Sequence, residues 1–192
     1  MRIERLLVIA GHCSGSFGLA LTEAYVEAAQ KEGREVRLLR LDQLQFDPIL
    51  HLGYQIVQPL EPDLQRAQED ISWAQHVTIA YPIWWGSVPA LLKGFLDRVL
   101  LPGYAFRYED GKRFPTPLLK GRSANLLVTM DTPPWYYQFM YRAPGIRQMK
   151  ITTLEFCGIA PVKTTMIGVV REFDEAQRKG WFAKVRKLAE GL

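Results

Sequence analysis

The amino-acid sequence predicts an α/β fold in which a doubly wound, five-stranded parallel sheet carries helices on both faces. Two observations lead to this fold class. Five short apolar runs of strand length alternate with five stretches that have apolar residues at helical spacing, which is typical of βαβ units. No internal repeat or linker interrupts the 192 residues, so we expect a single domain over residues 1–192 with right-handed crossovers.

The strands are predicted from continuous apolar runs bounded by turn residues. In chain order these runs are 5–10, 35–41, 76–81, 123–130 and 162–170. Pro82 follows the third run directly and should end its hydrogen bonding, because proline has no backbone N–H to donate.

The helices are predicted where apolar residues recur every three or four positions. They span 17–31, 63–73, 89–101, 146–157 and 174–190. Gly33 ends the first helix, and Pro89 suits the first turn of the third. Three stretches rich in Pro, Gly or aromatic residues are predicted to be irregular: 42–61, 101–119 and 131–145.

The composition is that of a soluble globular protein, with 48% hydrophobic and 23% charged residues. No apolar run reaches the roughly 20 residues that span a membrane, so no membrane insertion is expected. The start, Met1 to Arg5, leads directly into a strand pattern and does not resemble a secretory signal. Cys13 and Cys157 are too few for a disulfide framework. We therefore expect a cytoplasmic protein.

Positive charge is concentrated in one segment. The formal net charge is +4, but the segment from Arg107 to Lys150 holds eight Lys or Arg against three acids, a local surplus of 8 − 3 = +5. This surplus favours a small anionic ligand, such as a phosphate, near the segment, and a solvated basic face is the alternative. Nucleic acid is not expected as a partner, since the chain has no dense basic run and no known nucleic-acid motif.

The loop after the third predicted strand contains Pro82, Ile83, Trp84, Trp85 and Gly86. In an open parallel sheet the carboxyl ends of the strands meet at one edge, where ligands bind. Two prolines stiffen this loop, which then offers backbone groups and aromatic faces to a flat ligand. The alternative is that both tryptophans belong to the core.

The loop after the first strand runs from Gly11 to Gly18. The hydroxyls of Ser14 and Ser16, with the N–H groups and the dipole of the following helix, could cradle a phosphate. A turn that only caps the helix is the alternative. His12 is expected to be a hydrogen-bonding residue of this loop. The spacing matches neither a Walker loop nor the Gly-x-Gly-x-x-Gly fingerprint.

The loop after the fourth strand begins with Thr129, Met130, Asp131 and Thr132 and continues into a run of aromatic residues. Its hydroxyls can bond a polar ring edge, and its aromatic planes can stack on a second ring. A phosphate cradle on one loop and flat-ring contacts on two others together predict a flavin nucleotide.

Other sites find no support in the sequence. Cys13 lacks the arginine that would follow it in a phosphatase loop. His12, His51 and His76 form no pair at helical spacing, so no metal site is expected. There is no Gly-x-Ser-x-Gly motif of a serine hydrolase.

The run from Tyr81 to Val99, with Pro102-Gly-Tyr-Ala-Phe106 after it, resembles the NAD(P)H:quinone reductases of flavodoxin-like fold. Phe46-Asp47-Pro48, Leu154 to Gly158 and Ser16-Phe17 also match that family. The resemblance implies a flavin held by three sets of residues: His12, Ser14, Ser16 and Phe17; Pro82 to Gly86; and Thr129 to Thr132. It also implies a homodimer with the active site at its interface.

Two departures from the family pattern affect the expected site. Its FAD enzymes commonly have Thr-Thr-Gly-Gly where this chain has Thr129 to Thr132, and a tyrosine and a histidine that follow fall on Tyr137 and Ala143. A Tyr–His proton relay is therefore not supported. The chain is also short between Pro48 and Pro62, where longer members reach towards adenine. FMN is favoured, with FAD as the alternative.

The resulting hypothesis is an FMN-dependent NAD(P)H oxidoreductase that reduces quinones or similar two-electron acceptors by ping-pong hydride transfer. Tyr136 or Tyr137 would give a proton or a hydrogen bond to the acceptor oxygen. Two other functions stay open. A flavodoxin-type electron carrier would usually be acidic, unlike this basic chain, and some relatives of the family are flavin-binding regulatory subunits of potassium efflux transporters.

Overall fold

The computed structural model describes residues 3–54, 56 and 58–192. Its centre is a parallel sheet of five strands in the order β2-β1-β3-β6-β7. The strands are β1 (Arg5–Ala10), β2 (Glu35–Arg40), β3 (His76–Pro82), β6 (Ser123–Thr129) and β7 (Val162–Ile167). This order reverses direction between β1 and β3, so the loops after these two strands diverge and leave a crevice at the carboxyl edge of the sheet.

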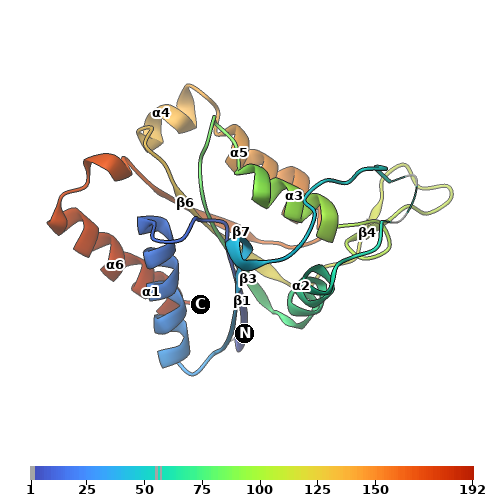
Figure 1. Cartoon of the computed structure of the whole chain (residues 1–192), viewed down its shortest axis with the longest axis horizontal. Coiled ribbons are helices and arrows are strands. Elements are labelled where there is room, and N and C mark those ends of the chain that lie inside the picture. Colours follow the sequence, from blue (N-terminus) through green and yellow to red (C-terminus); the bar gives the residue numbers. More distant parts are fainter. Residues whose placement is uncertain (1–2, 55, 57) are drawn as a thin grey trace.

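Helices cover both faces of the sheet (Figure 1). Alternate residues of β1 show why: Leu6 and Val8 pack in one core cluster, and Leu7 and Ile9 in the other, because successive strand residues point to opposite faces. The first cluster includes residues of α1 (Phe17–Lys31) and α6 (Glu175–Glu190), and the second residues of α2 (Pro62–Trp73) and α3 (Ala90–Val99). The predicted flavodoxin-like, doubly wound fold is confirmed.

The two predicted irregular segments 101–119 and 131–145 are more structured than the sequence indicated. The segment 131–145 contains the short helix α4 (Pro134–Phe139), and α5 (Pro144–Arg147) continues into the wide-turned helix η2 (Gln148–Glu155). Pro134 and Pro144 each lie in a first helical turn, a position that proline favours. The segment 101–119 contains a small antiparallel ribbon of β4 (Phe106–Arg107) and β5 (Thr116–Pro117).

Two further short helices and a shortened strand complete the element list. The 3-10 helices are η1 (Leu41–Gln43) and η3 (Val170–Glu172). The last strand ends at Ile167 rather than at the expected residue 170, because the chain turns into η3 at that point. Among the described residues, no helix combines the length and the hydrophobicity that crossing a membrane requires.

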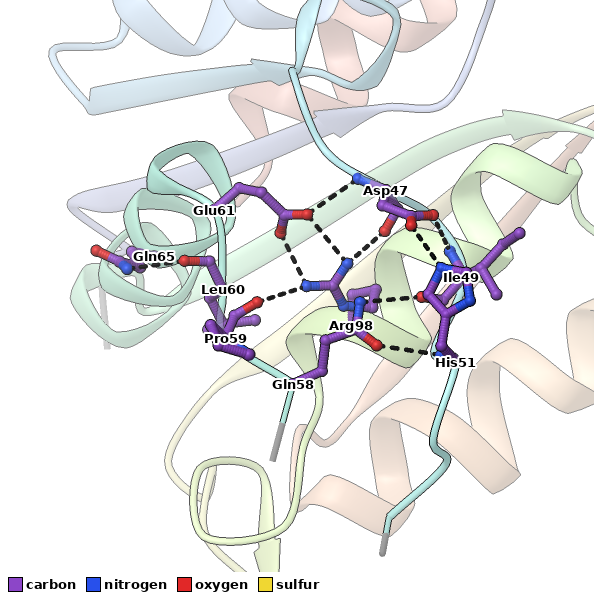
Figure 2. Close-up of polar contacts among 9 residues, drawn as sticks. All are labelled: Asp47, Ile49, His51, Gln58, Pro59, Leu60, Glu61, Gln65 and Arg98. Atoms are coloured by element: carbon purple, nitrogen blue, oxygen red, sulfur yellow. Dashed lines mark hydrogen bonds and ion pairs between the residues drawn. The ribbon is translucent and has the colours of Figure 1, made fainter. Parts of the chain in front are cut away.

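A buried arginine fixes the irregular segment that precedes α2 (Figure 2). Arg98 of α3 is fully buried and donates hydrogen bonds to the carbonyl oxygens of Asp47 and Pro59 and to both carboxylate oxygens of Glu61. Burial opposes ionisation of Glu61, but hydrogen bonds from the Asp47 N–H and from Arg98 outweigh it and hold the pKa of Glu61 below its usual value. Bidentate pairing of this kind fixes geometry as well as energy.

The same segment approaches α3 closely at a glycine. A Cβ atom at Gly94 would lie 2.5 Å from the Cβ atom of Pro48, so no other residue fits there without moving the backbone. The Phe46-Asp47-Pro48 motif and the run from Tyr81 to Val99 are therefore in direct contact, through Gly94 and through Arg98.

Candidate functional site

A cavity of about 380 Å³ lies at the carboxyl edge of the sheet. Its walls come from the loops after β1, β3, β6 and β7 and from the first turns of α6. Its volume falls within the range of ligand pockets. Ten of the predicted cofactor-binding residues line it: His12, Ser16, Phe17, Pro82, Ile83, Trp84, Thr129, Met130, Asp131 and Thr132.

The other three predicted residues, Ser14, Trp85 and Gly86, are not among the residues that line the cavity. Ser14 takes part in an exposed network, in which its hydroxyl donates to Asp42 at 2.6 Å and accepts from Arg40 at 2.7 Å. That network links the loop after β1 to the end of β2. In this arrangement the Ser14 hydroxyl is not directed at a cavity ligand.

The first turn of α1 borders the cavity. Ser16 is the N-cap residue, and its hydroxyl oxygen accepts a hydrogen bond from the N–H of Leu19 at 3.2 Å. The N–H groups of Phe17 and Gly18 begin the helix and have no intrahelical partner. Together with the helix dipole they give this wall of the cavity a positive potential.

His12 joins the first loop to β6. Its Nε2 atom lies 2.9 Å from the hydroxyl oxygen of Thr129, and burial lowers the pKa of His12 to about 4. The imidazole is therefore neutral near pH 7. Its ring packs directly on the backbone of α1, since a Cβ atom at Gly18 would lie 2.1 Å from Nε2. The absence of a side chain at Gly18 leaves room for the His12 ring.

A tight turn presents the two tryptophans. The N–H of Trp84 donates to the carbonyl of Ser87 at 3.0 Å, and the N–H of Ser87 returns a bond to Trp84 at 2.9 Å. Trp85 and Gly86, the central residues, have φ angles of 51° and 77°. Positive φ at both positions is typical of a type I′ turn and is uncommon for tryptophan. The turn leaves Trp84 half-exposed at the cavity and Trp85 fully exposed.

Tyr137 supports the Trp84–Ser87 turn from the interior of the protein. It is fully buried; its hydroxyl donates to the carbonyl of Gly86 at 2.8 Å and accepts from the N–H of Gly145 at 3.0 Å. Burial raises the pKa of Tyr137. A Cβ atom at Gly145 would lie 2.9 Å from the Cα atom of Ser87, so α5 touches the turn directly. Tyr136 is half-buried and packs edge-on against Trp135 and Tyr141.

The sequence-based reasoning missed the fourth wall, formed by Val170, Arg171 and Arg178. The Arg178 guanidinium lies 4.8 Å from the ring centre of Phe17, which places a positive charge beside the start of α1. The backbone N–H of Arg171 donates to Asp131 at 2.8 Å. The signal was available, because the loop after the fifth strand must end at the same sheet edge as the others. Cys13 and Gly18 also line the cavity.

The cavity therefore has two chemically different parts. The start of α1 and Arg178 form a cationic part that suits an anionic group. Pro82, Ile83 and Trp84 form a flat, largely apolar part that suits a ring system. Within the described ranges, no three His, Cys, Asp or Glu side chains lie together as a metal site would require.

The chain is similar to known proteins over most of its length. A family model described as flavodoxin-like fold matches residues 4–189. An uncharacterized NAD(P)H oxidoreductase of Haemophilus influenzae is 31% identical over 179 residues, which cover 90% of this chain and 88% of that protein. The NAD(P)H dehydrogenase [quinone] 1 of Rattus norvegicus is 31% identical over 196 residues, which cover 87% of this chain and 69% of the rat protein.

Among solved structures, an NAD(P)H:quinone oxidoreductase from Methanothermobacter marburgensis matches with a TM-score of 0.81. The match covers 98% of each chain at 24% sequence identity. At this level of identity the likeness concerns the fold.

Proposed function

This chain belongs to the flavodoxin-like fold family, and on that premise we propose that it is an FMN-dependent NAD(P)H oxidoreductase that reduces quinones or similar two-electron acceptors. Its relatives in Haemophilus influenzae and Rattus norvegicus are named as an NAD(P)H oxidoreductase and a quinone dehydrogenase. The observation that carries the proposal is the two-part cavity at the switch point of the sheet.

The residues of the cavity fit a flavin mononucleotide. Phe17 and Gly18 offer N–H groups without intrahelical partners at the cationic end, and Trp84 offers a half-exposed ring at the flat end. A bound flavin would supply the two-electron redox chemistry, accepting hydride from NAD(P)H and passing it to the acceptor. The protein would supply binding, orientation and electrostatic stabilisation.

The phosphate of the cofactor is assigned to the start of α1 and to Arg178. A dianion is stabilised by the helix dipole and by the guanidinium charge. Ser16 shapes this end as the N-cap residue, with its hydroxyl already bonded to the Leu19 N–H. Neutral His12 ties the loop to Thr129 of β6 and places no charge beside the ring.

Pro82, Ile83 and Trp84 would hold the ring, and Thr129 to Thr132 would bond its polar edge. Tyr137 would fix the Trp84–Ser87 turn from behind, because its hydroxyl is already bonded on both sides. Since that hydroxyl has no exposed surface, we assign Tyr137 a positioning role. Tyr136 is the tyrosine that we propose for contact with the acceptor.

FMN is preferred to FAD for two reasons. The segment between Pro48 and Pro62 is short, and it is tied down on α3 by Arg98. The cavity of about 380 Å³ also lies near the lower end of the range for ligand pockets, which suits a mononucleotide better than a dinucleotide.

We also propose that the protein works as a homodimer. Trp85 is fully exposed next to the cavity wall, and Tyr108, Phe114 and Trp135 are each more than 60% exposed. Large exposed aromatic side chains in long loops indicate a surface that binds a ligand or a partner chain. A second copy that covered Trp85 would also close the open side of the ring-binding part.

Steady-state turnover tests the proposed function. Purified protein supplied with FMN should oxidise NADH or NADPH in the presence of a benzoquinone. Flavin-free protein that is assayed without added FMN should not catalyse the reaction. Turnover without any added protein partner would also distinguish an enzyme from a one-electron carrier. Absence of turnover with both nicotinamide nucleotides and several quinones, in protein that holds FMN, would contradict the proposal.

A further inference from the structure

A second and larger hollow lies beside α4, away from the residues that line the flavin cavity. It has a volume of about 720 Å³ and is lined by residues of α4, α5, η2 and β7. It shares no lining residue with the flavin cavity. We call it the basic groove, and it is defined by these residues: Gln138, Phe139, Arg142, Ala143, Ile146, Arg147, Lys150, Ile151, Thr164 and Met166.

Three cations surround the basic groove, and its lining contains no acid. The side chains of Arg142, Arg147 and Lys150 form no ion pair or hydrogen bond with any residue in the described part of the chain. Elsewhere many cations are paired, for example Lys93 with Asp97 on α3. Arg147 at the end of α5 and Lys150 in η2 both line the groove, so two of its three cations come from this continuous helical segment.

The rest of the wall is apolar. Phe139 is 75% exposed and Ile151 47% exposed, and Ile146 and Met166 contribute further apolar surface. Exposed apolar side chains next to unpaired cations form a surface that is complementary to a molecule with an anionic head and an apolar body.

We propose that the basic groove binds a small amphipathic organic anion, such as a carboxylate or phosphate monoester with an aliphatic or aromatic body. The head would contact Arg142, Arg147 and Lys150, and the body would cover Phe139 and Ile151. Three of the eight cations between Arg107 and Lys150 line this site, and none of the eight lines the flavin cavity.

A second copy of the chain is a poor occupant of the basic groove. A two-fold interface centred on it would place the same three cations of each copy against those of the other. Like charges that meet without acids oppose association. An anion, in contrast, gains from the guanidinium pair, since arginine binds carboxylate and phosphate groups bidentately.

Calorimetric titration with octyl phosphate tests the proposal, with FMN present at saturation so that the flavin cavity is filled. Octyl phosphate should bind at least about tenfold more tightly than inorganic phosphate, because burial of the alkyl chain contributes. The double variant Arg142→Gln/Arg147→Gln should lose at least about tenfold in affinity, since it removes two charged hydrogen-bond donors. Phe139→Ala should weaken octyl phosphate but leave inorganic phosphate unchanged.

The matched control is Arg113→Gln/Arg186→Gln, which removes the same charge from exposed positions outside the groove. This control should bind octyl phosphate within about twofold of the wild type. Equal weakening in both double variants would show a general charge effect and overturn the proposal. A second outcome would also overturn it. If Arg178→Gln lost binding while Arg142→Gln/Arg147→Gln bound octyl phosphate as tightly as the wild type, the probe would sit in the flavin cavity.

Sedimentation of the same samples covers the remaining possibility. If Arg142→Gln/Arg147→Gln changed the oligomeric state of the protein, the groove would be an interface between copies and the proposal would fail. The proposal does not rest on the redox function. If the protein took up no FMN, it would still be titrated with octyl phosphate, and weaker binding by Arg178→Gln would reveal any probe in the flavin cavity.

Discussion

At the scale of single residues, the Tyr137 hydroxyl could position the Trp84–Ser87 turn or donate a proton to the acceptor. Its buried contacts predict that it positions the turn. Tyr137→Phe removes a buried hydroxyl that bonds the Gly86 carbonyl and the Gly145 N–H. The free energy of unfolding should fall by about 1–2 kcal/mol, while turnover at saturating substrates and FMN should fall less than about tenfold. Urea denaturation and steady-state kinetics measure the two effects.

Tyr136→Phe is the matched control, because it removes a neighbouring tyrosine hydroxyl that is only half-buried. It should leave stability almost unchanged. A loss of turnover of a hundredfold or more in Tyr137→Phe, without loss of stability, would instead make Tyr137 the proton donor.

Two buried histidines should make the stability of the fold depend on pH. Burial lowers the pKa of both His12 and His76 to about 4, whereas an unfolded histidine has a pKa of about 6.5. The unfolded chain therefore takes up protons first as the pH falls. The stability that these groups contribute is complete above about pH 6.5 and is lost progressively down to about pH 4.

Between about pH 7.5 and pH 5 each histidine should lower the free energy of unfolding by about 2 kcal/mol. Urea denaturation at the two pH values measures the loss, and His76→Gln should reduce it. His51→Gln is the control, since His51 is exposed and paired with Asp47. If His76→Gln and His51→Gln showed the same pH dependence as the wild type, the histidine account would be wrong.

Several residue positions could be predicted from the sequence because a strand end fixes them. His12 and Trp84 follow a strand and Thr129 is the last residue of one, and parallel strands end at one edge. The hydroxyl of Ser14 could not be placed, because its partners Arg40 and Asp42 come from another strand end. The burial of Tyr137 depends on a contact with Gly86, 51 positions away, which no local pattern encodes.

At the scale of elements, Arg98 is the strongest single tie between α3 and the irregular segment before α2. Arg98→Met should lower the free energy of unfolding by about 3 kcal/mol or more, because it leaves the partly buried Glu61 carboxylate and two carbonyl oxygens without their donor. Thermal or urea denaturation measures the loss.

Lys93→Met is the control on the same helix. It breaks the exposed ion pair with Asp97, and such pairs contribute about 0–1 kcal/mol. Equal losses in Arg98→Met and Lys93→Met would contradict the role given to the buried cluster.

The elements themselves were predictable where burial imposes a pattern. The strands β1, β2, β3 and β6 and the helices α1, α2, α3 and α6 follow the apolar spacing to within about two residues, whereas β7 ends three residues before its predicted end. The short helix α4 was not predicted, because the aromatic run from Trp135 to Phe139 shows no apolar periodicity. Its form depends on Pro134 in the first turn and on the bonds of Tyr137 to the neighbouring turn.

At the scale of the whole molecule, the exposed aromatic side chains predict self-association. Sedimentation equilibrium at micromolar concentration should give twice the chain mass of 22.0 kDa. Trp85→Ser should weaken the dimer, because it removes a fully exposed tryptophan from the proposed interface. A wild-type protein that sedimented only as a monomer would contradict the dimer.

The central claim is that the cavity at the carboxyl edge of the sheet holds a flavin. Titration of flavin-free protein with FMN, followed by quenching of the flavin fluorescence, tests it most directly. Trp84→Ala changes a tryptophan that lines the cavity, and Trp135→Ala changes an exposed tryptophan that does not. We expect micromolar or tighter binding by the wild type, an increase of Kd of at least about tenfold in Trp84→Ala, and no change beyond about twofold in Trp135→Ala. Absence of binding at about 100 μM FMN, or equal effects of the two substitutions, would contradict the claim.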